Sequence, residues 1–164
     1  MNAQQLYDYI IKPTHQYMGG NYESKESNFL SLCTAAIESN CGEYIKQING
    51  PALGIWQMEP DTHDDIWNNC DAFRDSDFLT RIDSLIPVFT FESLIDAPIY
   101  ACAMARLKYS MDPHPLPKLS GDKDLDCINF FEYYKRVYNT KFGASTYQKW
   151  VNALEGNGVW DVKL

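Results

Sequence analysis

Apolar residues recur at helical spacing along most of the chain. The clearest case follows Ser24, where Phe29, Cys33, Ala36 and Ile37 fall on one face of a predicted helix that runs into the polar stretch 38–42. The same period predicts further helices over residues 3–11, from about 62, over 76–86, over 127–138 and after 145. Pro98 suits a first helical turn, and the many small residues of 97–111 predict a central helix that another helix can approach closely. The pattern therefore favours a mainly α protein.

Prolines and capping residues predict where several of these helices begin and end. We expect Pro13 to end the first helix and Pro87 to end the helix over 76–86, because proline cannot donate the helical hydrogen bond. Thr62 and Asp65 have the spacing of a capping box, so the next helix should begin near 62. Ser145 is expected to cap the last helix.

Two stretches interrupt the helical pattern. Residues 47–60 hold glycines and prolines around the sequence Ile-Trp-Gln-Met, which predicts a short strand or an ordered loop. Residues 112–117 carry proline at alternate positions, which predicts a rigid extended connection. The 164 residues have the length of one domain. We therefore expect a single mainly α domain over residues 1–164, with at most a small β element near residues 50–60.

Charge and hydropathy exclude several functional classes. The formal net charge is −8, so the chain lacks the basic surface that duplex nucleic acid or an anionic membrane attracts. No apolar run approaches the roughly 20 residues that cross a bilayer, and the first residues lack the pattern of a signal peptide. We expect a monomer made soluble in the cytoplasm, with no nucleic-acid partner and no stable membrane insertion.

The cysteines and histidines are not spaced as metal ligands. The three histidines lie apart from one another and from the cysteines, and no two cysteines form a C-x-x-C pair. We therefore expect buried, reduced thiols, no metal and no cofactor. The cysteines are Cys33, Cys41, Cys70, Cys102 and Cys127.

Glu38 is the leading candidate for catalysis. It follows the apolar run 32–37 at the end of a predicted helix and precedes the break at 39–42. Burial at that boundary would raise the pKa of the carboxyl, and the negative end of the helix dipole acts in the same direction. A carboxyl that stays protonated near neutral pH can serve as a general acid.

Residues 54–62, with the sequence Gly-Ile-Trp-Gln-Met-Glu-Pro-Asp-Thr, form a second candidate segment. Trp56 offers a face on which a sugar ring can stack, and Gln57 offers hydrogen bonds to hydroxyl or N-acetyl groups. Composition alone equally favours Trp56 in the core and Gln57 in a turn.

Together these segments resemble the lytic transglycosylase and goose-type lysozyme family of peptidoglycan-cleaving enzymes. Glu38 and Ser39 are similar to its catalytic Glu-Ser pair, and residues 54–62 to its Gly-Leu-Met-Gln-x-x-Pro-x-Thr segment. Tyr138 and Asn139 are similar to its late Tyr-Asn pair, and residues 101–103 to its Ala-Gly-Ala helix. The resemblance spans about residues 28–143 and implies a lysozyme-like fold with two lobes and a cleft between them.

The resemblance implies that Glu38 protonates the glycosidic oxygen between N-acetylmuramic acid and N-acetylglucosamine. In lytic transglycosylases the same carboxylate then takes a proton from the muramoyl 6-hydroxyl and leaves a 1,6-anhydro end. By this mapping Tyr138 orients Glu38 through its hydroxyl. Separately, Arg136 and Lys141 lie near the proposed site in the sequence and could meet the muramoyl lactyl carboxylate or the stem peptide, although exposed basic residues are usually only solvated. The residues that would line the sugar site are Ser39, Trp56, Gln57, Tyr138 and Asn139.

Hydrolysis with inversion would instead need a second carboxylate, about 6.5 to 9.5 Å from the first, to activate water. The sequence does not choose among the acidic residues nearby, and we expect the single-acid route. The candidates for a second carboxylate are Glu43, Glu59, Asp61, Asp64 and Asp65.

Two other functions stay open from the sequence. The chain could be a lysozyme-like module that binds glycan or a virion protein without cleaving anything, or a helical adaptor in which the motifs arise by chance. The expected lack of a signal peptide and of a wall-binding module favours a bacteriophage protein. Such a protein would act on the cell wall as an endolysin, after membrane permeabilisation, or as a component of the virion.

Overall fold

The computed structural model describes residues 1–85, 89–139 and 143–164. Over these residues the regular structure is helical, and pairing of β type is limited to the isolated bridges Lys46–Leu53 and Leu53–Met58. The prediction of a mainly α domain with a small β element near residues 50–60 is confirmed.

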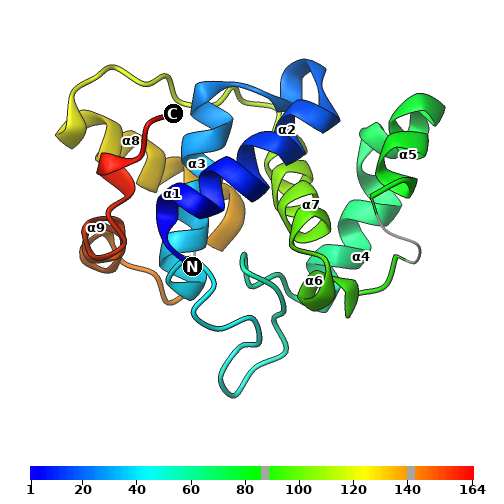
Figure 1. The fold of residues 1–164 in the computed structure, drawn as a ribbon, viewed down its shortest axis with the longest axis horizontal. Helices are drawn as coiled ribbons and strands as arrows, with labels where there is room; N and C mark the ends of the chain where they lie inside the picture. The colour runs from blue at the N-terminus through cyan, green and yellow to red at the C-terminus, as the bar shows by residue number, and fades with distance from the viewer. Residues whose placement is uncertain (86–88, 140–142) are drawn as a thin grey trace.

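Two long helices form the centre of the molecule (Figure 1). Helix α3 (Lys25–Ser39) begins with a capping box between Ser24 and Ser27, and helix α7 (Pro98–Ser110) begins with proline in its first turn. Both helices are buried over most of their length. The small side chains predicted in α7 lie in the core, where Ala101, Cys102, Ala103 and Ala105 are buried.

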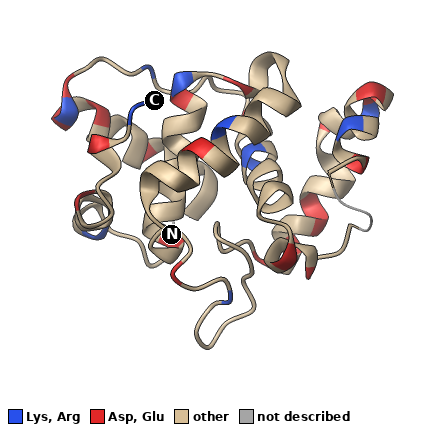
Figure 2. Ribbon diagram, in the orientation of Figure 1, with Lys and Arg blue, Asp and Glu red and all other residues tan. Residues whose placement is uncertain are grey.

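The other helices pack on both sides of this centre (Figure 1). On one side lie α8 (Lys123–Tyr134) and α9 (Tyr147–Gly156), and on the other α4 (Pro60–Asn69), α5 (Ser76–Asp83) and the short α6 (Ser93–Asp96). The N-terminal α1 (Ala3–Leu6) and α2 (Lys12–Met18) lie across α3 and α7. Acidic residues are prominent along α4 and near α6 (Figure 2).

Pro13 does not end the first helix, so that prediction is wrong. A π-helical turn, Tyr7–Ile11, joins α1 to α2, and the backbone N–H of Lys12 donates to the carbonyl of Tyr7. The wider turn admits the proline ring in the first turn of α2 without the carbonyl clash that a regular helix would impose.

The starts of two other helices, α4 and α9, differ from the prediction. Helix α4 begins at Pro60 rather than near 62, because proline suits the first helical turn, and Thr62 therefore lies inside the helix and caps nothing. The cap of α9 is Thr146, whose side chain accepts from the backbone N–H of Lys149, rather than Ser145. Helix α5 ends at Asp83, and the predicted stop at Pro87 lies outside the described residues.

The loop between α3 and α4 hangs below the central helices in Figure 1 and is ordered by its backbone. Asn40, in the left-handed region, ends α3, and the loop then closes on itself through the bridges at Leu53. A Cβ atom at Gly54 would lie 2.7 Å from the carbonyl oxygen of Leu94, so only glycine lets the loop approach the α6–α7 corner this closely.

All five cysteines are free and buried, as predicted. In the part of the chain that the structure describes, no helix combines the length and apolar character that crossing a membrane requires.

Candidate active site

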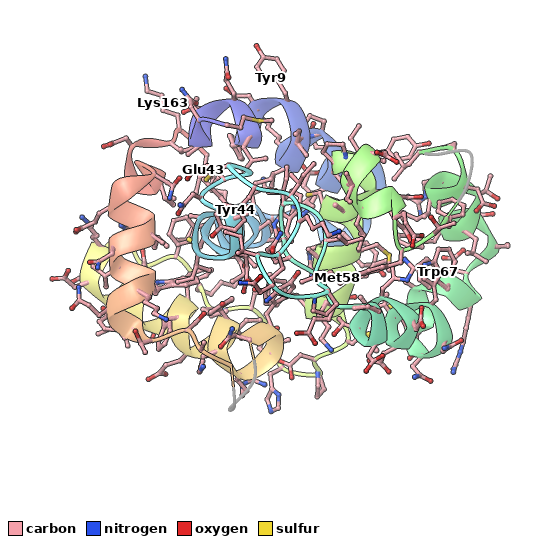
Figure 3. The ribbon with its side chains drawn as sticks, turned by 90° about the horizontal axis from the view of Figure 1, so that it is seen from below. Tyr9, Glu43, Tyr44, Met58, Trp67 and Lys163 are labelled. Carbon is pink, nitrogen blue, oxygen red and sulfur yellow. The ribbon has the colours of Figure 1, made fainter. Side chains whose placement is uncertain are left out.

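A cavity of about 590 Å³ opens where the C-terminal end of α3 meets the α3–α4 loop. Its remaining walls come from the first turn of α4, from α7, from the π-helical turn Lys135–Asn139 that follows α8, and from residues 143–145. Figure 3 views the loop over the end of α3, with Tyr44 and Met58 labelled on it. We call this cavity the cleft. Its polar lining includes Glu38, Tyr44, Gln57, Glu59, Lys108, Tyr138, Asn139 and Ser145.

Glu38 lies in the last turn of α3, partly buried, and lines the cleft. Burial raises the pKa of its carboxyl from 4.5 to about 7, a hydrogen bond from Tyr134 lowers it, and the charge of Glu59 raises it. The sequence predicted a raised pKa for this carboxyl, and a pKa of about 7 lets it donate or accept a proton near neutral pH.

Tyr134 fixes the position of this carboxyl. Its hydroxyl donates to Oε1 of Glu38 over 2.6 Å, and it also lies 2.9 Å from Oγ of Ser145. Burial and the neighbouring Glu38 raise the pKa of the phenol, so it remains a donor throughout the physiological range. This hydrogen bond holds Oε1 of Glu38 in place at the wall of the cleft.

The predicted orienting role of Tyr138 is therefore wrong. Its hydroxyl donates to the backbone carbonyl of Trp56 over 2.8 Å and braces the α3–α4 loop, although the residue still lines the cleft. Tyr134 precedes Tyr138 by one helical turn on the same aromatic face. Helical spacing alone could have offered both as partners of Glu38, but could not choose between them.

Two further predicted residues do line the cleft. Gln57 has a positive φ of 46°, and its side-chain amide donates to the carbonyl of Gly54 over 2.7 Å, which holds it at the wall. Asn139 accepts from Lys135 through its side-chain oxygen over 2.7 Å. Both side chains are thus held in place before any ligand arrives.

Ser39 does not line the cleft, although the sequence predicted it to line a sugar site. It is fully buried, and its hydroxyl donates to the carbonyl of Ile55 over 2.6 Å and accepts from the backbone N–H of Gly42 over 2.9 Å. Its side chain ties the end of α3 to the loop. Its effect on the cleft is indirect, because it fixes the backbone next to Glu38.

Trp56 offers no stacking surface, so this prediction is also wrong. Its side chain is 1% exposed, and the indole N–H donates to the carbonyl of Ser31 over 2.9 Å. The backbone of Gln57 has a positive φ, and the loop turns at this residue. The side chain of Trp56 lies in the core, whereas that of Gln57 lines the cleft.

Of the acidic residues proposed as a second carboxylate, Glu59 is the one that lines the described part of the cleft. Its charge also contributes to the raised pKa of Glu38. Glu43 accepts instead from the side chain of Asn40, and Asp65 accepts from Asn69.

Lys108 is the basic side chain in the described lining of the cleft, and its ammonium lies 3.9 Å from Asp65. The sequence had suggested Arg136 or Lys141 near a substrate carboxylate. Arg136 is engaged elsewhere, in two 2.9 Å hydrogen bonds to Asp112, and Lys141 lies outside the described residues. Lys108 was not recognised because nothing in the sequence shows that this side of α7 faces the end of α3.

The described lining of the cleft can support proton transfer by a carboxyl. It offers an acid whose pKa is raised to about 7, a second carboxylate, amide side chains held in place and the ammonium of Lys108. Among the described residues, no group of three or more His, Cys, Asp or Glu side chains is placed to hold a metal ion. Comparisons with protein-family models, curated proteins and solved structures found no match to this chain.

Proposed function

We propose that this protein cleaves the β-1,4 bond between N-acetylmuramic acid and N-acetylglucosamine in peptidoglycan, with Glu38 as the general acid. The observation that carries the proposal is the state of Glu38, which lines a cleft, is held by Tyr134 and has a pKa of about 7. The resemblance of residues 38–39 and 54–62 to the lytic transglycosylase and goose-type lysozyme family supports the choice of substrate.

In the first step, the protonated carboxyl of Glu38 gives its proton to the glycosidic oxygen as the bond to the muramoyl C1 breaks. The sugar that leaves carries the new hydroxyl, and positive charge develops at C1. Glu38 is then a carboxylate. It takes the proton from the muramoyl 6-hydroxyl while that oxygen bonds to C1, which closes the 1,6-anhydro ring and restores the acid.

Glu59 provides the alternative second step. As a carboxylate on the same cleft, it could take a proton from a water molecule that attacks C1, and the product would be a reducing end. We favour the single-acid route, in which Glu59 assists by keeping Glu38 protonated.

The decisive experiment compares the protein with Glu38→Gln on purified peptidoglycan, with release of soluble muropeptides as the readout. We expect a loss of roughly 10²- to 10⁴-fold, the usual contribution of a general acid. Glu43→Gln is the matched control, because its carboxylate bonds Asn40 at the surface, and its activity should stay near that of the parent. An active Glu38→Gln variant would refute the proposal. Tight binding to peptidoglycan with no release by the parent would instead identify a silent glycan-binding module.

Mass spectrometry of the digest separates the two routes. Anhydro products weigh one water less than hydrolytic products. On the single-acid route, Glu59→Gln changes the rate and the pH profile but leaves anhydro ends. Reducing ends that disappear in Glu59→Gln would assign the base to Glu59.

The proposed place of action is the bacterial cell wall, with glycan strands as the partner. An endolysin would meet them after the membrane is permeabilised, and a virion component would meet them during entry. Lysis from without, assayed by adding the purified protein to intact and to permeabilised cells, separates these two uses.

A further inference from the structure

A second cavity, of about 750 Å³, lies away from the cleft, near the N-terminal end of α3. It is lined by the turn Gly20–Tyr22, by the end of α7 and by residues 112–116. About 12 residues separate Glu26, in this lining, from Glu38 along α3, and the helical rise places them about 18 Å apart. This cavity therefore does not belong to the proposed catalytic site.

Arg106 lines this second cavity and is only 5% exposed. Its Nε donates to the carbonyl of Tyr22 over 3.0 Å, and its Nη2 donates to the carbonyl of Asn21 over 2.8 Å. These bonds use two of the five N–H groups of the guanidinium. The side chain also packs on the ring of Tyr22, with 5.5 Å between the guanidinium carbon and the ring centroid.

No carboxylate within the described ranges pairs with Arg106. The other charged groups of the lining either have partners of their own or lie further out. Asp112 is held by Arg136 in two hydrogen bonds, and Glu26 lies 3.8 Å from Lys118. Glu23 lines the cavity but is exposed. A guanidinium cannot shed its proton, so its buried charge is left with neutral partners alone.

We propose that the second cavity binds the carboxylate of an amino acid or of a peptide C-terminus, with Arg106 as the anion-binding residue. The planar guanidinium matches a carboxylate in charge and geometry. Tyr22, Tyr109, Tyr133 and Leu116 give the cavity apolar and aromatic walls for the rest of the ligand.

The charge around Arg106 selects against more highly charged anions. Glu26 lies beside Lys118 and Asp112 is held by Arg136, so Glu23 is the carboxylate of the lining with no charged partner among the described residues, and the whole protein carries a formal charge of −8. This negative charge disfavours a phosphate dianion more than a single carboxylate, and it favours the ammonium of a zwitterion. The inference is independent of peptidoglycan cleavage, because it uses none of the residues in the cleft.

The test is a titration of the full-length protein, followed by the backbone amide resonances of residues 20–24 and of the non-proline residues between 110 and 116. The probes are alanine, alanyl-alanine, alanyl-alaninamide and inorganic phosphate. We expect at least one of the two carboxylates to bind with a Kd of about 1 mM or tighter, and the amide to bind roughly tenfold more weakly or not at all. Alanine and alanyl-alanine distinguish a free amino acid from a peptide end. Three results would overturn the proposal. The dipeptide and its amide could bind equally well, the resonance shifts could be confined to other residues, or phosphate could bind more strongly than the carboxylates.

Removing Arg106 could unfold the turn Gly20–Tyr22, because its side chain donates to two carbonyls there. Variants at a neighbouring position therefore test whether the ligand binds in this cavity. Ser110 lines the cavity at the exposed end of α7, and its hydroxyl donates only to the carbonyl of Leu107. Ser110→Glu brings a competing carboxylate and should weaken carboxylate binding roughly tenfold, whereas Ser110→Lys, of similar size, should preserve or tighten it. The same affinity in both variants would contradict the assigned site. Arg106→Lys, if folded, should also bind more weakly, because the planar fork is lost.

Discussion

Glu38 and Arg106 are two charged residues that lie against the core near opposite ends of α3, and they differ in how each can relieve the cost of burial. A carboxyl becomes neutral by taking up a proton, and the pKa of Glu38 is raised to about 7 accordingly. A guanidinium has no such option and must be surrounded by acceptors, here two backbone carbonyls. The same physical cost thus yields an acid at one site and an anion-binding group at the other.

The first way to test this comparison is Arg106→Met. The substitution leaves the carbonyls of Asn21 and Tyr22 without their charged donor, so we expect the free energy of unfolding to fall by about 2 to 4 kcal/mol. Urea unfolding at pH 5 and pH 8 should show a similar loss at both, because Arg106 does not titrate in that range. An unchanged stability would mean that the guanidinium holds nothing in place.

Glu38→Gln should have the opposite effect on stability. The pKa of Glu38 is higher in the folded protein, about 7, than its ordinary value of 4.5, so the folded state binds more protons and the parent loses stability as pH rises through this window. Glutamine does not titrate, so the variant does not lose this stability as the pH rises. We expect the variant to be more stable by on the order of 2 kcal/mol at pH 8, after allowing for partial exposure, and equal to the parent at pH 4. A variant less stable at pH 8 would contradict the raised pKa.

The pH profile of muropeptide release tests Tyr134. In the parent, the rate should fall above pH 7 as Glu38 loses its proton. Tyr134→Phe removes the hydrogen bond that lowers the pKa of Glu38, so the alkaline limb should move to higher pH while the maximal rate falls roughly tenfold from poorer orientation. A merely structural role would lower the rate without moving the limb. Tyr138→Phe is the matched control, and its limb should stay in place because its hydroxyl bonds Trp56.

Ser145→Ala should have the smallest effect. Ser145 lies 2.9 Å from the hydroxyl of Tyr134 and, among the described residues, makes no hydrogen bond to Glu38. Since a neutral hydrogen bond contributes about 0.5 to 1.5 kcal/mol, we expect a loss of activity of roughly threefold and no shift of the alkaline limb. A loss as large as that of Tyr134→Phe would show that Ser145 acts directly on the substrate or on Glu38.

The sequence predicted the two central helices from runs of apolar and small residues, and the structure buries both helices over most of their length. Helices α3 and α7 were predicted from their spacing of apolar and small residues, and the position of Glu38 followed from the break after α3. Pro13 shows the limit of such rules, because a π-helical turn accommodates a residue that usually ends a helix. The cap at Thr146 instead of Ser145 is the same kind of limit, since adjacent residues both have capping side chains.

The residues predicted for the site fall into two groups, those that line the cleft and those buried beneath it. Glu38, Gln57, Tyr138 and Asn139 were predicted and do line the cleft, whereas Trp56 and Ser39 belong to the packing beneath it. A sequence motif specifies residue types and their order, but the backbone φ at a single position decides which neighbour faces the core.

The sequence by itself determined a mainly helical domain, its buried thiols and an acid placed at the end of a helix, because these depend on local periodicity and on the side chain's own chemistry. Only the tertiary structure decided that Tyr134 holds that acid, that Glu59 and Lys108 share its cleft, and that Arg106 lines a second cavity where none of the described carboxylates pairs with it. Those relations join residues far apart in the chain, and a hydrogen bond or a shift in pKa depends on distance and burial, which no local pattern records.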